Sequence, residues 1–176
     1  YCDNEYVYSI INNNHKRIYN INDKRYLLGK HNLIDIMFVL GVSELFNLDI
    51  NKTILTINNF KGLEHRLELV GTYNDVIYYN DVIATIPEAT ISAIETLNNV
   101  DTLIFGGMDR HIEYDSLISF LKASSISNLV CMPTTGFNIG KILKEECDKN
   151  IFFVNTLEEA HEVAKENTAK GKICLL

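Results

Sequence analysis

The chain has 176 residues, a net charge of −7 and a hydrophobic share of 47%. This is the composition of a globular protein with enough apolar side chains to build a core, and its acidic balance without any Lys/Arg-rich run argues against nucleic acid as the main partner. No apolar run reaches the roughly 18–20 residues that a membrane span needs, so we expect no membrane partner either.

The cysteines are scattered, at positions 2, 131, 147 and 174, and they form no C-x-x-C pair. This spacing predicts neither a zinc site nor a disulfide framework, and it favours buried free thiols in a reducing cytoplasm. The first residue is tyrosine, no signal-peptide pattern follows, and the chain closes on the strand-like run "KICLL". We therefore expect a fragment of a longer cytoplasmic protein.

Residues 1–61 are predicted to form a hairpin followed by helices. "EYVYSIINNNHKRIYNI" indicates strand, turn and strand, with the turn at 12–15. The run "LIDIMFVLGVSELFNL" is apolar almost all round, which is typical of a buried helix. A second short helix is predicted over 51–60, with Asn51 as its cap.

From about residue 67 to the end, short apolar strands alternate with amphipathic helices. The first two strands flank a turn at 72–75, and Pro87 stands in the first turn of the helix that follows. Such alternation predicts an α/β fold, in which a mostly parallel, Rossmann-like sheet carries helices on both faces.

Ligands of an open parallel sheet bind beyond the carboxyl ends of its strands. The residues that follow the predicted strands are Asn80, Asp81 and Thr85; Gly106, Gly107, Asp109, Arg110 and His111; Thr134, Thr135 and Gly136; and Asn155 and Thr156. We expect these sets to lie along one edge of the sheet.

Each set also has an ordinary structural explanation. Asn-Asp after a strand commonly makes a turn or a helix cap, Asp109 and Arg110 commonly make a solvated ion pair, and Thr156 with Glu159 makes a capping box. "GFNIGK" resembles a phosphate loop only faintly. It is one residue too short, and Ile142 stands where Ser or Thr would bind magnesium.

Two further pairs stand near predicted boundaries. His65 and Arg66 lie at the junction of the two parts, where Arg66 could bind a phosphate or carboxylate or could form a salt bridge to Glu64 or Glu68. The pair "HN" at 31–32 opens the apolar helix, where Asn32 could act as a cap.

Four motifs in order carry a family resemblance: "GKHN", "NNFKGLEHRLELVG", "YYNDVIATIPEAT" and "IFGGMDRHIEYDSL". Together they resemble the Mur ligases, the ATP-dependent amide ligases of peptidoglycan synthesis, and most closely the branch that adds D-glutamate. The likeness is strongest over about residues 27–120. It implies that residues 1–61 are the end of the family's P-loop ATPase central domain. Residues 62–176 would be most of its C-terminal, amino-acid-binding domain.

The resemblance also implies roles for single residues. Asn32, Arg66 and Asp81 would bind ATP, while Thr85, with Ile83 beside it, would bind D-glutamate. No catalytic nucleophile and no metal ligand is expected in this fragment. Mg²⁺ would be held mainly by the missing part of the central domain, and the other substrate would be UDP-N-acetylmuramoyl-L-alanine. We expect a cytoplasmic monomer that is inactive as a fragment.

The sequence departs from the family pattern at several positions. Val82 replaces a common serine, Ile83 replaces a lysine found in some members, Asp35 replaces a second asparagine, and His111 replaces a glycine. Three alternatives stay open: a related ligase for another amino acid, a non-catalytic domain that keeps the fold, and an NAD-binding domain. The absence of a glycine fingerprint argues against the last.

Overall fold

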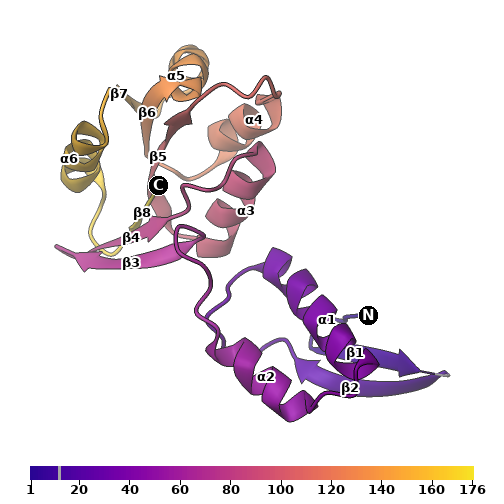
Figure 1. The fold of residues 1–176 in the computed structure, drawn as a ribbon. Coiled ribbons are helices and arrows are strands. Elements are labelled where there is room, and N and C mark those ends of the chain that lie inside the picture. Colours follow the sequence, from indigo (N-terminus) through magenta and orange to yellow (C-terminus); the bar gives the residue numbers. More distant parts are fainter. Residues whose placement is uncertain (12) are drawn as a thin grey trace. The chain divides into compact units, whose positions relative to one another are not determined.

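The computed structural model describes residues 1–11 and 13–176. It divides the chain into two compact units, Tyr1–Gly62 and Leu63–Leu176 (Figure 1).

The first unit is a hairpin packed against two helices. Strands β1 (Tyr6–Ile11) and β2 (Asn14–Asn20) are antiparallel, and helices α1 (Lys30–Leu45) and α2 (Ile50–Asn59) follow. The predicted order of elements is confirmed. The turn predicted at 12–15 includes residue 12, which lies outside the described residues. Strand β2 begins at Asn14, so residues 14 and 15 of the predicted turn belong to the strand. The core of this unit consists of Val7, Tyr19, Ile36, Leu40 and Ile57.

The prediction that Asn51 caps α2 is wrong by two residues. Asp49 is the cap: its Oδ1 atom accepts hydrogen bonds from the amides of Asn51 at 3.0 Å and Lys52 at 3.2 Å. An aspartate suits this place because its charge also complements the positive end of the helix dipole.

Helix α1 is buried on one face only, so the prediction of a fully buried helix is wrong for this structure. Ile36 and Leu40 are buried, whereas 71% of Phe38 and 76% of Leu45 are exposed. A helix that is apolar all round needs cover on every side, and the hairpin and α2 cover one side.

The second unit is built on a six-stranded sheet with the order β3-β4-β8-β5-β6-β7. Strands β3 and β4 are antiparallel, and all other neighbours are parallel. The strands are β3 (Glu68–Tyr73), β4 (Val76–Asn80), β5 (Val100–Gly107), β6 (Asn128–Thr134), β7 (Asn150–Phe153) and β8 (Ile173–Leu175). The helices are α3 (Pro87–Leu97), α4 (Asp115–Ala123), α5 (Thr135–Glu146) and α6 (Leu157–Asn167).

Both faces of this sheet carry helices, which confirms the predicted α/β architecture. Leu103 of β5 packs with α3, α4 and α5 on one face, and its neighbour Ile104 packs with α6 on the other. Figure 1 shows α6 on the opposite side of the sheet from these three helices. After β7 the chain returns through α6 and inserts β8 between β4 and β5.

The segment "GFNIGK" lies within helix α5, so it is not a phosphate loop. A Cβ atom at Gly140 would stand 2.6 Å from the Cys131 Sγ atom, which shows that this glycine lets α5 pack closely on β6. The predicted capping box of α6 is confirmed. Thr156 Oγ1 accepts from the Glu159 amide at 3.2 Å, and Glu159 Oε2 accepts from the Asn155 amide at 2.7 Å.

The cysteines fit the prediction of free thiols, and two of them are fully buried. Cys131 and Cys174 lie in the sheet, where burial raises the pKa of each thiol to about 12. Cys2 and Cys147 are half-buried. The two sheet cysteines therefore act as small apolar residues at neutral pH.

A buried polar network ties together the amino ends of the central strands. The Asn128 Nδ2 atom donates to Thr102 Oγ1 at 3.1 Å and to the Asn167 carbonyl at 2.9 Å, and Asn128 Oδ1 accepts from Asn150 Nδ2 at 2.9 Å. Asp101 accepts from the Ser127 hydroxyl at 2.7 Å. This edge lies opposite the carboxyl ends, so the network serves stability rather than ligand binding.

We predict that Asn128→Ala lowers the free energy of unfolding by about 2–4 kcal/mol, because it removes a buried side chain together with its bonds to Thr102, Asn150 and the Asn167 carbonyl. Thermal and urea unfolding measure this. Asn150→Ala is the control, since Asn150 is exposed and that variant removes one bond only, with an expected cost of about 1 kcal/mol or less. Equal losses in the two variants would contradict this account of the network.

Candidate functional site

A cavity of about 280 Å³ opens at the carboxyl ends of β4, β5 and β8. The loop after β4, the end of β5 and the first turns of α3, α4 and α5 form its walls. Its lining of polar residues and glycines includes Asp81, Thr85, Gly106, Gly107, Arg110, Tyr114 and Thr135, and its apolar floor includes Leu103, Ile139 and Leu175. The cavity lies where an open parallel sheet is expected to bind its ligand.

The loop after β4 brings Asp81 and Thr85 to the cavity. The Asp81 amide donates to the carbonyl of Leu176 at 2.6 Å, and the Ala84 amide donates back to the Asp81 carbonyl at 2.8 Å, which closes a turn. Thr85 follows this turn, just ahead of Pro87 in the first turn of α3. Asn80 thus ends β4 and Asp81 begins a turn, in line with the ordinary structural explanation of this pair. The same turn brings the Asp81 and Thr85 side chains to the cavity.

Two glycines allow β5 to approach β6 and α5 closely at the floor of the site. A Cβ atom at Gly106 would lie 2.5 Å from the Met132 carbonyl oxygen, and one at Gly136 would lie 2.5 Å from the Phe105 carbonyl oxygen. Both obstacles are backbone atoms, which a side-chain rotation cannot move away. The Thr135 hydroxyl adds a bond of 3.2 Å to the Gly107 carbonyl.

Arg110 also lines the cavity, in the loop between β5 and α4. The explanation of Asp109 and Arg110 as an ion pair is not what the structure shows. Asp109 Oδ1 accepts from the His111 amide at 2.8 Å, and Asp109 Oδ2 lies 4.0 Å from His111 Nδ1. The cavity lining therefore carries one carboxylate, Asp81, and one guanidinium, Arg110.

The five predicted binding residues do not all gather at this cavity. Asp81 and Thr85 line it, whereas Ile83, although it lies between them in sequence, is 45% exposed and is not part of the lining. Arg66 is an exposed residue just before β3. Asn32 belongs to the first unit, near the start of α1.

Asn32 does not cap α1. The helix has Gly29 at its cap position without a side-chain cap bond, while Asn32 is buried and its Nδ2 atom donates to the Leu28 carbonyl at 2.6 Å. Its amide also lies 3.1 Å from the His31 ring. These bonds fix the turn that leads into α1.

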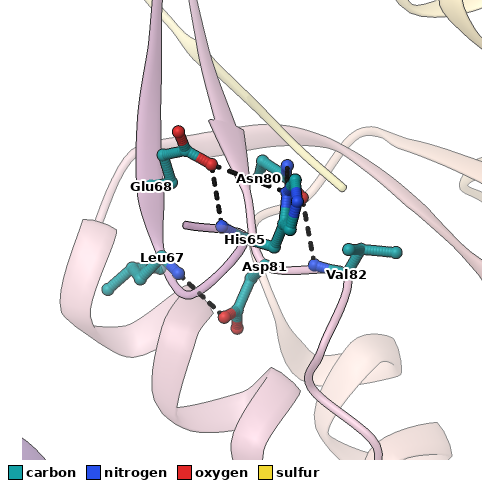
Figure 2. A network of polar contacts seen from close by, with 6 residues as sticks. All are labelled: His65, Leu67, Glu68, Asn80, Asp81 and Val82. Atoms are coloured by element: carbon teal, nitrogen blue, oxygen red, sulfur yellow. Dashed lines mark hydrogen bonds and ion pairs between the residues drawn. The ribbon is translucent and has the colours of Figure 1, made fainter. Parts of the chain in front are cut away.

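The segment before β3 is linked to the end of β4 by side chains (Figure 2). Asp81 Oδ1 accepts from the Leu67 amide at 2.9 Å, and Asn80 Nδ2 lies 2.8 Å from His65 Nδ1. His65 Nδ1 also lies 3.7 Å from a Glu68 carboxylate oxygen. No ion pair joins Arg66 to Glu64 or Glu68 in the part of the chain that the structure describes.

No group of three or more His, Cys, Asp or Glu side chains that could hold a metal ion occurs among residues 1–11 and 13–176. Within the same residues, no helix combines the length and the apolar character needed to cross a membrane.

Several curated relatives of this chain share one name. The chain is 31% identical over all 176 residues to a UDP-N-acetylmuramoylalanine–D-glutamate ligase of Lachnospira eligens, and it covers 39% of that protein. It is 35% identical over 150 residues to the enzyme of the same name in Clostridioides difficile, and it covers 33% of that one. The chain belongs to the Mur ligase family. It corresponds to a C-terminal part of the D-glutamate-adding members, and it spans little more than a third of their length.

Solved structures agree on the fold. A UDP-N-acetylmuramate–alanine ligase of Thermotoga maritima matches 92% of the chain and 38% of its own length, with a TM-score of 0.69 at 19% identity. A MurF ligase of the same organism, solved in complex with ADP, matches 92% of the chain and 36% of its own length, with a TM-score of 0.65 at 15% identity. No protein-family model matches the chain.

The sequence pattern predicted an ion pair with Asp109 as the ordinary role of Arg110, although Arg110 stands among the residues expected at the carboxyl edge of the sheet. The signal that could have identified it is its place after a strand that ends in two glycines. Backbone without side chains leaves room for a long neighbouring side chain to reach a ligand.

We predict that Gly136→Ala lowers the free energy of unfolding of the second unit by about 2–4 kcal/mol, because the added methyl group meets backbone that cannot rotate away. Thermal unfolding measures the change. Gly41→Ala is the control, since no atom lies within 4 Å of its added methyl group, and this helix substitution should be neutral or stabilising by about 0.5–1 kcal/mol. A Gly136→Ala protein that unfolds like the wild type would refute the close approach of β5 and α5.

Proposed function

We propose that the full-length protein is an ATP-dependent ligase that adds D-glutamate to UDP-N-acetylmuramoyl-L-alanine in the cytoplasm, acting as a monomer. The similarity to ligases of that name over the whole chain is the observation that carries the proposal. The cavity at the carboxyl edge of the sheet supports it, because a carboxylate, a hydroxyl and a guanidinium converge there.

In the proposed reaction, ATP transfers its γ-phosphoryl group to the carboxylate of the muramoyl substrate and leaves as ADP. The amino group of D-glutamate attacks the resulting acyl phosphate, and the tetrahedral intermediate expels phosphate to leave the amide. Such chemistry asks the protein for positioning and charge neutralisation rather than for a covalent nucleophile. This fits a cavity lined by Asp81, Thr85 and Arg110.

We assign roles to three residues that line the cavity and to three that do not. Arg110 would bind a carboxylate of D-glutamate, because a guanidinium forms paired hydrogen bonds with a carboxylate. The Thr85 hydroxyl would donate to the same amino acid, and Asp81 would accept the hydroxyl protons of the ATP ribose. Outside the lining, Ile83 would contact D-glutamate, and Arg66 and Asn32 would contact the nucleotide.

The relatives' name and the ADP complex of the MurF ligase favour ATP as the nucleotide. Magnesium does not fit the described residues of this chain, since they contain no cluster of three suitable ligands. We therefore place the magnesium site in the remainder of the central domain, and we propose that residues 1–61 are the end of that domain and residues 62–176 the amino-acid-binding domain.

The test is phosphate release by the full-length protein with ATP, Mg²⁺ and UDP-N-acetylmuramoyl-L-alanine, comparing D-glutamate with a panel of other amino acids. We expect release that depends on D-glutamate. Release with a different amino acid instead would keep the ligase and change its substrate. Release with none would favour a domain that keeps the fold without catalysis.

We predict that Arg110→Met raises the KM for D-glutamate by about 10-fold or more, because the variant keeps an unbranched stem and removes the charged group that pairs with the carboxylate. The KM for ATP should change less than about twofold. Lys141→Met on the exposed surface of α5 is the control for the loss of one positive charge. An unchanged KM for D-glutamate in Arg110→Met would remove Arg110 from the site.

A further inference from the structure

The backbone directly before β3 takes a conformation that its residues do not favour. His65 has a φ of 63° and Leu67 has a φ of 46°, both in the left-handed region, and neither residue is glycine. Residues with a Cβ atom stay in that region only where surrounding contacts hold them there. The question is which contacts hold this segment.

Each backbone amide from 65 to 67 has a partner. The His65 amide donates to Glu68 Oε2 at 2.8 Å, the Arg66 amide to the Leu63 carbonyl at 3.3 Å, and the Leu67 amide to Asp81 Oδ1 at 2.9 Å. Arg66 lies between the two left-handed residues, and its side chain is exposed to solvent. The direction of the Arg66 Cα–Cβ bond is therefore set by contacts of its neighbours.

Asn80 adds a contact that reaches two segments at once (Figure 2). Its Nδ2 atom lies 2.8 Å from His65 Nδ1, and its Oδ1 atom accepts from the Val82 amide at 3.2 Å. An amide nitrogen can only donate, so the neutral His65 ring accepts at Nδ1 and carries its proton on Nε2. One side chain thus joins residues 65–67 to the loop that bears Asp81 and Thr85.

We propose that Asn80 is a positioning residue for nucleotide binding: by holding the His65 ring and the Val82 amide, it fixes the segment that presents Arg66 in register with the loop that presents Asp81. The proposal rests on the proposed function, since it assigns nucleotide contacts to Arg66 and Asp81. It adds to that function a role for two residues, Asn80 and His65, that need not touch the ligand.

Glu68 is a second neighbour of the His65 ring. Its carboxylate oxygen lies 3.7 Å from the Nδ1 atom that the Asn80 amide approaches at 2.8 Å. The shorter distance makes Asn80 the hydrogen-bond partner of this nitrogen.

Two variants of the full-length protein test the proposal. Asn80→Ala removes both contacts, and we expect the KM for ATP to rise about 10-fold while kcat falls less than about twofold. Asn80→Asp keeps the acceptor for the Val82 amide but cannot donate to neutral His65. Its KM for ATP should lie between those of the wild type and Asn80→Ala, because one of the two contacts remains.

The control variant is Asn167→Ala, because Asn167 is an exposed asparagine whose Nδ2 atom bonds a carbonyl of its own helix at 2.8 Å. It should behave as the wild type. The proposal is overturned if Asn80→Ala has the wild-type KM for ATP, if kcat falls and KM does not change, or if Asn80→Asp has the wild-type KM for ATP.

Failure of the proposed function can be told apart from failure of this inference. If the wild type releases no phosphate with any amino acid, the proposed function fails, and amide hydrogen exchange of the same proteins decides the contact itself. Exchange of the Val82 amide that is at least about 10-fold faster in Asn80→Ala than in the wild type supports the link between the two segments. Equal exchange rates overturn it.

Discussion

The insertion of β8 between β4 and β5 is the constraint on which the candidate site depends. This short strand, Ile173–Leu175, pairs with β4 on one side and with β5 on the other. Just beyond it, the Leu176 carbonyl accepts the Asp81 amide and the Leu176 amide donates to the Tyr79 carbonyl. The last residues of the chain therefore hold the loop that bears Asp81 beside the glycines at the end of β5, and the cavity lies between them.

The chemistry of the cavity follows from what each neighbouring element can supply. The loop after β4 supplies a carboxylate and a hydroxyl because it turns tightly before α3. The end of β5 supplies backbone without side chains, because it consists of two glycines. Gly106 and Gly136 also let β6 and α5 approach this end closely. The loop before α4 is then free to carry Arg110 to the same space. The chain as a whole is acidic, with a net charge of −7, so an anionic ligand gains nothing from the overall field and depends on this local cation.

The contacts of Asn80 and Asp81 show that a binding loop can also be a structural element. Asp81 lines the cavity and at the same time accepts the Leu67 amide, while Asn80 holds the His65 ring. Removing the Asp81 carboxylate would alter the cavity and the segment before β3 together. The effect of such a substitution on activity would therefore combine the loss of a ligand contact with the loss of a structural contact. A substitution of Asn80, which is not part of the cavity lining, changes the structural contacts alone.

Much of this structure could be predicted from the sequence, because local chemistry determines it. Apolar runs of strand length between amphipathic helices indicated the parallel sheet, Thr156 and Glu159 indicated the start of α6, and the position of Asp81 and Thr85 after a strand indicated the carboxyl edge. The order of four motifs indicated the family. Each of these signals lies within a few residues or in the order of segments along the chain.

Only the tertiary structure decided the remaining features. The insertion of β8, the approach of Gly136 to Phe105 and the place of Arg110 in the cavity join residues far apart in the chain, and no local pattern encodes them. The exposure of one face of α1 went against expectation for the same reason. A side chain's surroundings depend on which distant segments pack against it, whereas its propensity for helix or strand depends mainly on its neighbours in sequence.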